Sequence, residues 1–421
     1  MSLPPPLAAA LLALAFATGP AAAEDARPVV LTATSNNAVA YWNEVANRTV
    51  NAPAGAASTP EERRPAYHLD LATVHVAVYD AVNAIDGRHQ PYAIAPRAPA
   101  AGASMDAAAA AAAYGVLRAL FPNRGAVYEA AYEQFLQTLP AGEARQRGLA
   151  LGQEVAAGIV ALRAGDGRDV ALAPFVSSSA PGHFRSAGPN PYNRQVPFIK
   201  PFALQRVDQF RPAGPPPLDS DAYAKAFQQS KALGGTRSTA RTAEQLETAR
   251  FHTEPPWLFL TRNLGRFARS TPDVVEAARL MALIYVAHAD AITACFEAKY
   301  HYDFWRPQSA IPLAARDGDP AWTPVLPTPN HPEYPAAHSC TAGALGEALH
   351  QHYGTRAVGY TFDSSVTGTT RRYATTDALG VESETARVAG GMHFAFSTAD
   401  GLELGVRVAR WVAEHHFGPR R

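Results

Sequence analysis

Helical periodicity recurs along most of the chain, and this pattern restricts the fold more than any other feature of the sequence. Apolar residues at helical spacing predict a first group of helices over residues 67–85, 103–120, 126–139 and 141–164. A second group is predicted over residues 220–233, 242–251, 273 to about 306, 337–353, 378–392 and 398–417. Strand patterns are few and no internal repeat is visible, so we expect an all-α helical-bundle fold.

A long segment without helical periodicity, residues 173–218, separates the two groups of helices. It is dense in Pro, Gly and Ser and contains "FVSSSAPGHFRSAGPNPYNRQVPF" and "FRPAGPPPLD". A loop of this length inside a domain is functional or disordered, and its aromatic and arginine residues favour an ordered cover. We therefore expect one domain over 24–421, with an N-terminal helical half (24–218) and a C-terminal half (219–421).

The first 23 residues have the pattern of a secretory signal peptide. An apolar stretch over 7–17 is too short to span a bilayer, and Ala21 and Ala23 form a small-residue cleavage site before Glu24. The residues before the apolar stretch depart from the usual signal-peptide pattern because they include no Lys or Arg. We expect no later stretch to be long and apolar enough for a transmembrane helix, so the sequence predicts a soluble, secreted or periplasmic protein without a membrane partner.

Charge and cysteine content exclude several classes of partner and site. Lys plus Arg and Asp plus Glu both number 37, so the chain lacks the positive charge that nucleic-acid binding needs. Cys295 and Cys340 are the two cysteines, too few for a disulfide scaffold or a zinc cluster. An exported chain could join them, but two buried thiols are the favoured interpretation, since sequence does not give geometry.

The segment "KYHYDFWRP" places Lys299 and Arg306 seven residues apart. Seven residues are nearly two turns, so a continuous helix would carry both cations on one face with a drift of about 20°. Pro307 would then end or kink that helix. Asp303 could pair with either cation but neutralise only one. Packing of the two cations along aromatic rings is the alternative.

Two further segments carry histidines at helix boundaries. In "NHPEYPAAHSC", His338 enters a helix start whose backbone N–H groups are free to bind an oxyanion. In "ARVAGGMHF", Arg387 and His393 are six residues apart, so a straight helix would not place both side chains on one face. A break at Gly390 and Gly391 could bring the two side chains together. The alternatives are a capping or core histidine and a glycine-capped helix end.

Taken together, these segments supply a set of groups suited to one chemical task. Three cations, Lys299, Arg306 and Arg387, accompany two histidines and a helix N-terminus. Arginine offers planar multi-donor contacts to oxyanions and lysine a point charge. One histidine could bind the central atom of a tetrahedral or trigonal-bipyramidal oxyanion while the other moves protons.

The order K-x6-R-P, P-x-x-H and R-x5-H resembles the signature of the vanadium-dependent haloperoxidases. That family shares the signature with the type 2 phosphatidic acid phosphatases and bacterial acid phosphatases. The text around the motifs, "DAITACFEAKYHYDFWRPQSAI", "WTPVLPTPNHPEYPAAHS" and "GGMHFAFSTADGLELG", is similar to bacterial secreted members, as is "VHVAVYDAVNAI". The resemblance extends over most of the chain beyond about residue 40 and implies an all-α double-bundle fold.

The resemblance also implies a role for each motif residue. His393 would bind vanadium, while Lys299, Arg306 and Arg387 would neutralise the equatorial oxygens of vanadate. His338 would be the acid–base residue, and Lys299 would polarise bound peroxide. The implied partners are hydrogen peroxide, a halide and an organic acceptor, and a homodimer is left open.

The second motif departs from the family's usual P-S-G-H. Here it is Pro335-Ala336-Ala337-His338. The backbone N–H of Ala337 would replace the glycine N–H at the cofactor, but Ala336 cannot donate the usual hydroxyl hydrogen bond, which is worth about 1.5–3 kcal/mol to a charged group. We therefore expect weaker cofactor binding or peroxide activation, with the ligand, acid–base group and cations retained.

His331, seven residues before His338, bears on the choice of halide. It resembles the histidine of algal bromoperoxidases rather than the phenylalanine of the fungal chloroperoxidase, which favours bromide and iodide over chloride. A loop histidine before Pro332 without such a role is the alternative.

Two other functions fit the same residues. A metal-free phosphomonoesterase would use His393 as the nucleophile, forming a phosphohistidine, with His338 protonating the leaving alcohol. The absence of a hydroxyl at Ala336 motivates a non-catalytic anion-binding relative. The wider sequence around the motifs favours the peroxidase.

Overall fold

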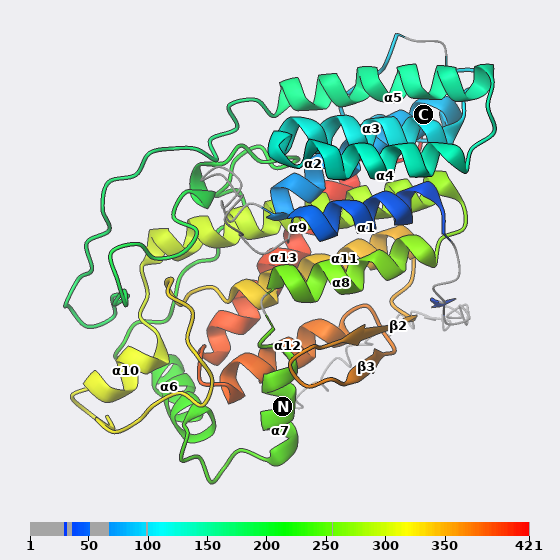
Figure 1. Cartoon of the computed structure of the whole chain (residues 1–421). Helices are drawn as coiled ribbons and strands as arrows, with labels where there is room; N and C mark the ends of the chain where they lie inside the picture. The colour runs from blue at the N-terminus through cyan, green and yellow to red at the C-terminus, as the bar shows by residue number, and fades with distance from the viewer. Residues whose placement is uncertain (1–28, 32–35, 51–66, 98–99, 255, 421) are drawn as a thin grey trace, which may run out of the picture.

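Helices dominate the structure, as the periodicity predicted. The computed structural model describes residues 29–31, 36–50, 67–97, 100–254 and 256–420 (Figure 1). The all-α expectation is confirmed, apart from three short strands. The predicted signal peptide over 1–23 lies outside the described residues.

The N-terminal helices follow one another with short connections. They are α1 (Ala38–Val50), α2 (Tyr67–Asp86), α3 (Met105–Leu120), α4 (Gly125–Gln137) and α5 (Glu143–Leu162). Figure 1 shows α2 to α5 gathered at one end of the molecule. The alanine-rich face of α3 is buried, and α3 packs against α2 and α5.

The second half contains α6 (Asp221–Gly234), α7 (Ala243–Phe251), α8 (Pro256–Arg269), α9 (Val274–Tyr302), α10 (Pro307–Leu313), α11 (Ala337–Tyr353), α12 (Ala378–Ala389) and α13 (Ala395–His415). Side-chain oxygens cap the starts of three of these helices, α6, α7 and α9, which satisfies backbone donors that the helices leave free. Helices α1, α8 and α10 were not predicted from the sequence.

A small sheet lies beside these helices. β1 (Val29–Val30) pairs in parallel with β2 (Val358–Asp363), and β2 pairs antiparallel with β3 (Thr370–Tyr373). Tyr360 lies opposite Tyr373 in this register. The alternating burial of β2 shows that one of its faces packs on the helices.

Helix α9 is the central helix of the core, and most of its residues are buried. Its length and mean hydropathy would allow it to cross a membrane, so the expectation that no later stretch has this composition was wrong. Within the protein, 94% of its most apolar window is buried, because α2, α11 and α13 pack around it. Burial on nearly all sides accounts for the largely apolar composition of α9.

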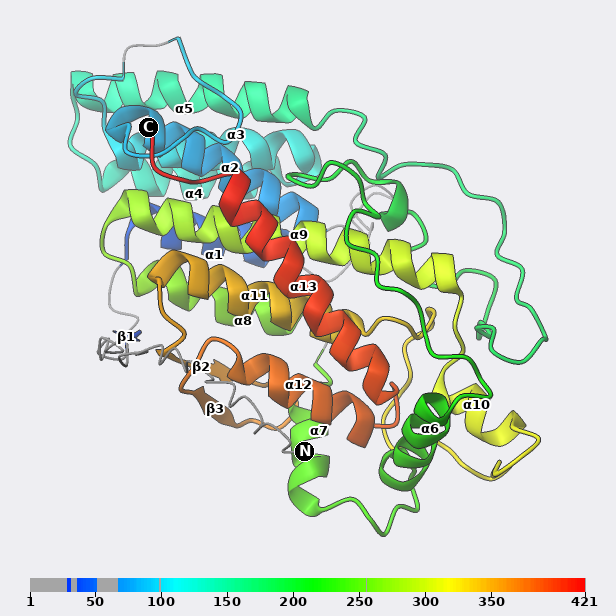
Figure 2. The ribbon, with the colours of Figure 1, turned by 180° about the vertical axis from the view of Figure 1, so that it is seen from behind.

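Helices α11 and α13 pack closely enough for their backbones to meet. A Cβ atom added at Gly405 would lie 2.0 Å from the carbonyl oxygen of Cys340. Only glycine therefore permits this approach. Figure 2 shows α13 passing across α9 and α11, the two helices that deliver Lys299 and His338.

The long segment over 173–218 is anchored along its length, which confirms the expected ordered cover. Phe184 donates its backbone N–H to the Asp303 carbonyl at 2.7 Å, and Tyr192 donates to the Asn330 carbonyl at 2.8 Å. Three successive backbone N–H groups, beginning at Phe202, donate to the buried Asp290 carboxylate. The segment thus contacts the chain next to Arg306 and His331.

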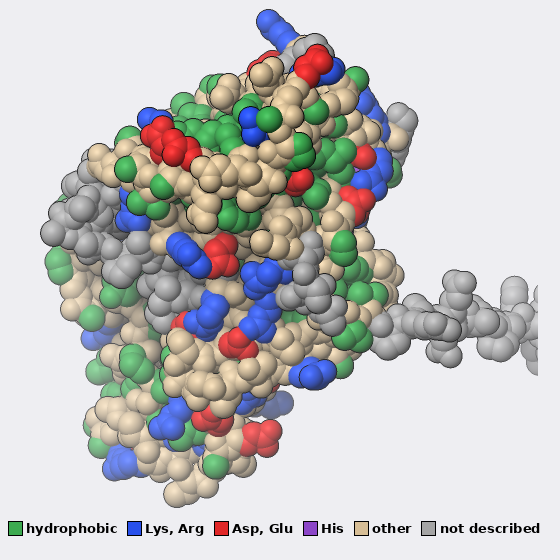
Figure 3. Space-filling view, turned by 45° about the vertical axis from the view of Figure 1, so that its right-hand side comes forward, with side chains coloured by type: hydrophobic (Ala, Val, Ile, Leu, Met, Phe, Trp, Pro, Cys, Tyr) green, Lys and Arg blue, Asp and Glu red, His purple; other side chains and the backbone are tan. Residues whose placement is uncertain are grey.

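The surface carries charges of both signs. On the face drawn in Figure 3, basic and acidic side chains are interspersed among apolar ones. This distribution follows the balanced composition of the sequence.

Candidate functional site

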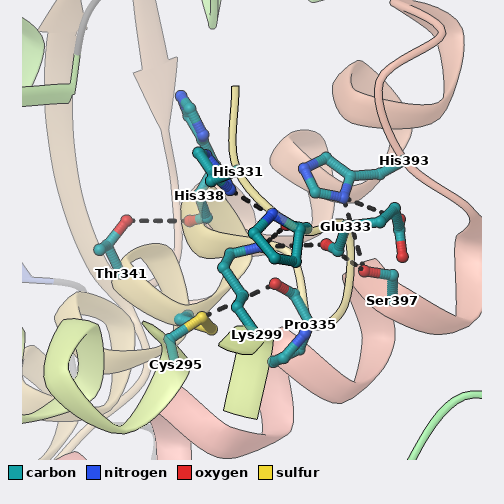
Figure 4. The surroundings of a disulfide bond; sticks show 11 residues. Cys295, Lys299, His331, Glu333, Pro335, His338, Thr341, His393 and Ser397 are labelled. Atoms are coloured by element: carbon teal, nitrogen blue, oxygen red, sulfur yellow. Dashed lines mark hydrogen bonds and ion pairs between the residues drawn. A yellow bond between two sulfur atoms is a disulfide. The ribbon is translucent and has the colours of Figure 1, made fainter. Parts of the chain in front are cut away.

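The three sequence motifs meet at the ends of four helices. Lys299 lies near the end of α9, Arg306 directly before α10, His338 in the first turn of α11 and Arg387 near the end of α12, while His393 lies between α12 and α13. Figure 4 shows Lys299, His331, Glu333, His338 and His393 around the loop that leads into α11. The grouping expected from the motif order is therefore present.

The helix predicted through Arg306 was wrong. α9 ends at Tyr302, because Asp303 adopts the left-handed conformation with φ 48°. Arg306 is extended, with φ −82° and ψ 155°, and Pro307 begins α10 instead of ending α9. Asp303 pairs with neither cation, since its carboxylate contacts His183 Nδ1 at 3.0 Å.

Arg306 connects the two histidine segments. Its Nε donates to the His331 carbonyl at 2.9 Å, and one terminal nitrogen donates to the Met392 carbonyl at 2.9 Å. The same nitrogen lies 2.9 Å from His393 Nε2, and the other lies 3.0 Å from His331 Nδ1. Because arginine only donates, His393 Nε2 accepts and carries its lone pair toward the cations.

Glu333 holds the other side of the His393 ring. Its buried carboxylate lies 2.8 Å from His393 Nδ1 and accepts from the Phe394 N–H at 2.9 Å. A carboxylate at Nδ1 fixes the proton there and leaves Nε2 unprotonated. Burial raises the pKa of Glu333 to about 7, although Arg306 and Lys299 oppose this rise.

The glycine pair separates Arg387 from His393, as expected. α12 ends at Ala389, and Gly391 has φ +77°, a conformation that other residues rarely adopt. A Cβ atom at Gly391 would lie 2.4 Å from the Gly234 carbonyl oxygen of α6. The turn and its close contact with α6 therefore require glycine.

Lys299 is fully buried and held by backbone carbonyls. Its Nζ donates to the carbonyls of Pro332 at 3.0 Å and Glu333 at 2.9 Å. Burial lowers the pKa of Lys299 well below its usual range, and the Arg306 and Arg387 charges lower it further. An anion beside this ammonium would offset both effects.

His338 lies in the first turn of α11. Ala336 is the N-cap residue, and its methyl group cannot accept a hydrogen bond from the first backbone N–H groups of the helix. His338 Nε2 is buried and has no hydrogen-bond partner among the described residues. Burial and the Arg387 charge lower the pKa of His338, which keeps the ring neutral.

The charges in this site are unbalanced. Lys299, Arg306 and Arg387 are buried, and none forms an ion pair with a carboxylate within the described ranges. Burial lowers the pKa of Arg306 to about 10 and of Arg387 to about 9, so both stay protonated at neutral pH. Among the described residues, Glu333 is the carboxylate that opposes these charges in the centre of the site. Buried cations need counter-charges, so the arrangement suits a bound oxyanion.

The two cysteines form a disulfide, so the favoured interpretation as two thiols was wrong. Cys295 on α9 and Cys340 on α11 are joined across a Cα–Cα distance of 6.5 Å. Cys295 is one turn before Lys299, and Cys340 is two residues after His338. The bond therefore connects the two helices that carry these site residues.

Glu333 is the site residue that sequence reasoning missed. It lies inside the segment "NHPEYPAAHSC", in which the histidines carry the clearer chemical signal. An acidic residue between two prolines, in a segment expected to meet three cations, was the available signal. Its contact with His393 joins residues 60 positions apart.

Comparison with known proteins agrees with this geometry. Residues 279–418 match the family model described as the VCPO second helical-bundle domain. The C-terminal half carries this domain. The match contains Lys299, Arg306, His338, Arg387 and His393, so the predicted resemblance to the vanadium haloperoxidase family is confirmed.

Relatives of known sequence and structure belong to the same group. Vanadium chloroperoxidase of Curvularia inaequalis is 27% identical over 213 residues, which are 40% of this chain and 35% of that protein. The chain thus covers about a third of that relative's length. A bacterial vanadium-dependent iodoperoxidase structure has a TM-score of 0.73 at 21% identity, covering 91% of this chain and 96% of its own. A holo-type bacterial vanadium-dependent chloroperoxidase has a TM-score of 0.66 at 16% identity, covering 91% and 98%. These likenesses show a shared fold.

Proposed function

We propose that the protein is an exported vanadate-dependent haloperoxidase that oxidises halide with hydrogen peroxide, with bromide and iodide favoured over chloride. One observation carries this proposal: the unprotonated His393 Nε2 faces buried cations that lack carboxylate partners within the described chain. A vanadate ion would supply both the negative charge and the central atom that this arrangement needs. When bound, vanadate would act as a Lewis acid toward peroxide.

Each residue has a defined task in this proposal. His393 Nε2 would be the ligand, and Glu333 is a positioning residue that holds the ring through Nδ1. Lys299, Arg306 and Arg387 would contact the oxyanion oxygens, together with the backbone N–H of Ala337 at the start of α11.

His338 would move the proton of the reaction. Its neutral ring and unpartnered Nε2 make it able to accept a proton from a peroxide that enters the site. It could return that proton when the oxidised halide leaves. His331 remains the proposed determinant of halide preference: its ring contacts Arg306 and lies edge-on to Phe296 with centroids 5.1 Å apart.

The disulfide supports export. Structural disulfides form in oxidising compartments and are rare in the cytosol. A buried bond between Cys295 and Cys340 therefore accords with the predicted signal peptide over 1–23 and a secreted or periplasmic location.

Halide oxidation with hydrogen peroxide, measured with and without added orthovanadate, tests the proposal. We expect bromination of an organic acceptor that depends on orthovanadate. The second candidate is a metal-free phosphomonoesterase, which the Glu333–His393 pair also favours because it orients a nucleophilic imidazole. Hydrolysis of a generic phosphate ester without vanadate-dependent bromination would refute the peroxidase and support the phosphatase.

Orthovanadate is expected to stabilise the folded protein, and Lys299→Met to reduce this effect. A ligand present at 100 times its Kd adds about 2.7 kcal/mol to the free energy of unfolding. Met has nearly the shape of Lys but no charge, so the affinity for orthovanadate should fall about ten-fold or more. Thermal unfolding at increasing orthovanadate concentrations measures both effects. Equal stabilisation of the two proteins would show that Lys299 does not face the anion.

Ala336→Ser is expected to strengthen vanadate binding. The serine hydroxyl would restore the donor of the usual family motif, and a hydrogen bond to a charged group is worth about 1.5–3 kcal/mol. As the N-cap of α11, serine would also stabilise the helix by about 1 kcal/mol. Vanadate titration separates the two effects, because capping alone would raise stability without changing affinity. Unchanged affinity would mean that the side chain at Ala336 does not reach the oxyanion.

A further inference from the structure

The turn after α12 closes on Arg387 itself. The Met392 N–H donates to the Arg387 carbonyl at 3.2 Å, and the Gly391 N–H donates to the Val388 carbonyl at 3.0 Å. Because Gly391 is in the left-handed conformation, these two bonds form a Schellman motif at the helix end. The motif brings the side chain of Met392 against that of Arg387, at a pair of positions whose contact is usually hydrophobic.

In this protein the contact joins a thioether to a guanidinium. Arg387 Nη2 donates to Met392 Sδ at 2.8 Å, and Arg387 Nη1 donates to the His252 carbonyl at 3.2 Å. Met392 and Arg387 are each 1% exposed, so bulk water does not compete for these donors. The two contacts hold the guanidinium at both of its terminal nitrogens, which fixes the direction of its plane.

The sulfur atom holds Arg387 without compensating its charge. A thioether is a weak, polarisable acceptor and carries no negative charge. Arg168 shows the opposite arrangement, because the carboxylates of Asp166 and Asp70 bind its guanidinium. Arg387 has no carboxylate partner within the described chain, and its Nε has no hydrogen-bond partner there. The Arg387 charge therefore stays available to a bound anion.

Met392 also contacts the second arginine of the site. Its backbone carbonyl accepts from Arg306 Nη1 at 2.9 Å, and His393 follows it directly in the chain. One residue thus contacts both guanidinium groups beside the proposed ligand histidine. A change of its side chain would reach the anion through Arg387.

We propose that Met392 is a positioning residue whose thioether orients the Arg387 guanidinium toward the bound oxyanion without neutralising it. The inference rests on the proposed function, which uses the Arg387 charge to hold vanadate. A carboxylate in place of the sulfur would orient the same guanidinium but compete with the anion for it. An aliphatic side chain would leave the guanidinium without one of its two contacts.

Two replacements of Met392 separate positioning from packing. Leucine conserves the volume but accepts no hydrogen bond, whereas glutamine is of similar length and has a carbonyl acceptor. The affinity of the full chain for orthovanadate, measured by isothermal titration, should fall about five-fold in Met392→Leu and stay near the wild-type value in Met392→Gln. A packing role predicts the reverse order, because leucine fills the space and a buried amide is costly. That reverse order would overturn the inference.

Met392→Glu tests whether the missing charge matters. Its carboxylate should pair with Arg387, so the affinity for orthovanadate should fall at least ten-fold below that of Met392→Gln. Equal affinities of these two variants would overturn the inference. Met281→Leu is the matched control, because Met281 is also fully buried but lies within α9, and it should keep the wild-type affinity.

Inorganic phosphate distinguishes failure of this inference from failure of the proposed function. Phosphate is also a tetrahedral oxyanion, and its binding requires no peroxidase activity. A wild type without vanadate-dependent bromination would refute the proposed function, whereas the order of phosphate affinities among the Met392 variants would still decide the role of the thioether. Phosphate affinities that are the same in the wild type and all three Met392 variants would overturn that role.

Discussion

A His393→Ala variant is expected to lose both orthovanadate binding and vanadate-dependent halide oxidation completely. Glu333 holds the ring proton of His393 on Nδ1, so the lone pair of His393 Nε2 faces the cations. Alanine removes that ligand and leaves the three cations in place. Isothermal titration with orthovanadate measures the loss directly, and bromination with hydrogen peroxide measures its consequence.

His89→Ala is the control for this variant. His89 also contacts a carboxylate, Glu276, at 2.9 Å, but it lies outside the site. Its replacement removes a comparable histidine–glutamate contact and should preserve vanadate binding. Retained oxidation in His393→Ala would refute the assignment of the site itself. The wild type could instead hydrolyse a phosphate ester without bromination, and His393→Ala could lose that hydrolysis. His393 would then be the nucleophile of a phosphatase.

Most of the helices could be predicted because burial of one helix face imposes a pattern on the sequence. Of the unpredicted helices, α1 and α8 also carry an amphipathic pattern, so a signal of this kind was present in the sequence. α1 starts after Asn37, whose side chain accepts from the Ala40 N–H, and that cap was visible in the sequence as "SNN". α8 begins at Pro256, the second of two successive prolines, and packs against α1, α9 and β2, so tertiary contacts also stabilise it.

The site residues could be predicted as a set, but their local geometry could not. Spacing alone suggested that Lys299 and Arg306 share a helix, whereas a single left-handed residue, Asp303, redirects the chain between them. Such a conformation depends on tertiary contacts, here with His183 and Phe184 of the long segment. The Glu333–His393 contact likewise joins distant segments, which periodicity cannot reveal.

The disulfide also could not be predicted from the sequence, and its removal is expected to change the free energy of unfolding strongly. Cys295 and Cys340 are 45 residues apart in sequence, and only the packing of α9 on α11 brings them together. Replacement of both by alanine should lower the free energy of unfolding by about 4 kcal/mol, because the unfolded chain regains the freedom of that loop. Urea unfolding of the two proteins measures the difference.

Three further measurements separate the contribution of the disulfide to stability from that of local packing. Cys295→Ala alone should destabilise the protein nearly as much as the double replacement, since either breaks the bond. A reducing agent should lower the stability of the wild type and leave the double variant unchanged. The same loosening should weaken orthovanadate binding, because Lys299 and His338 each lie within one turn of a cysteine. A double variant as stable as the wild type would instead mean that packing of α9 on α11 alone holds these two residues together.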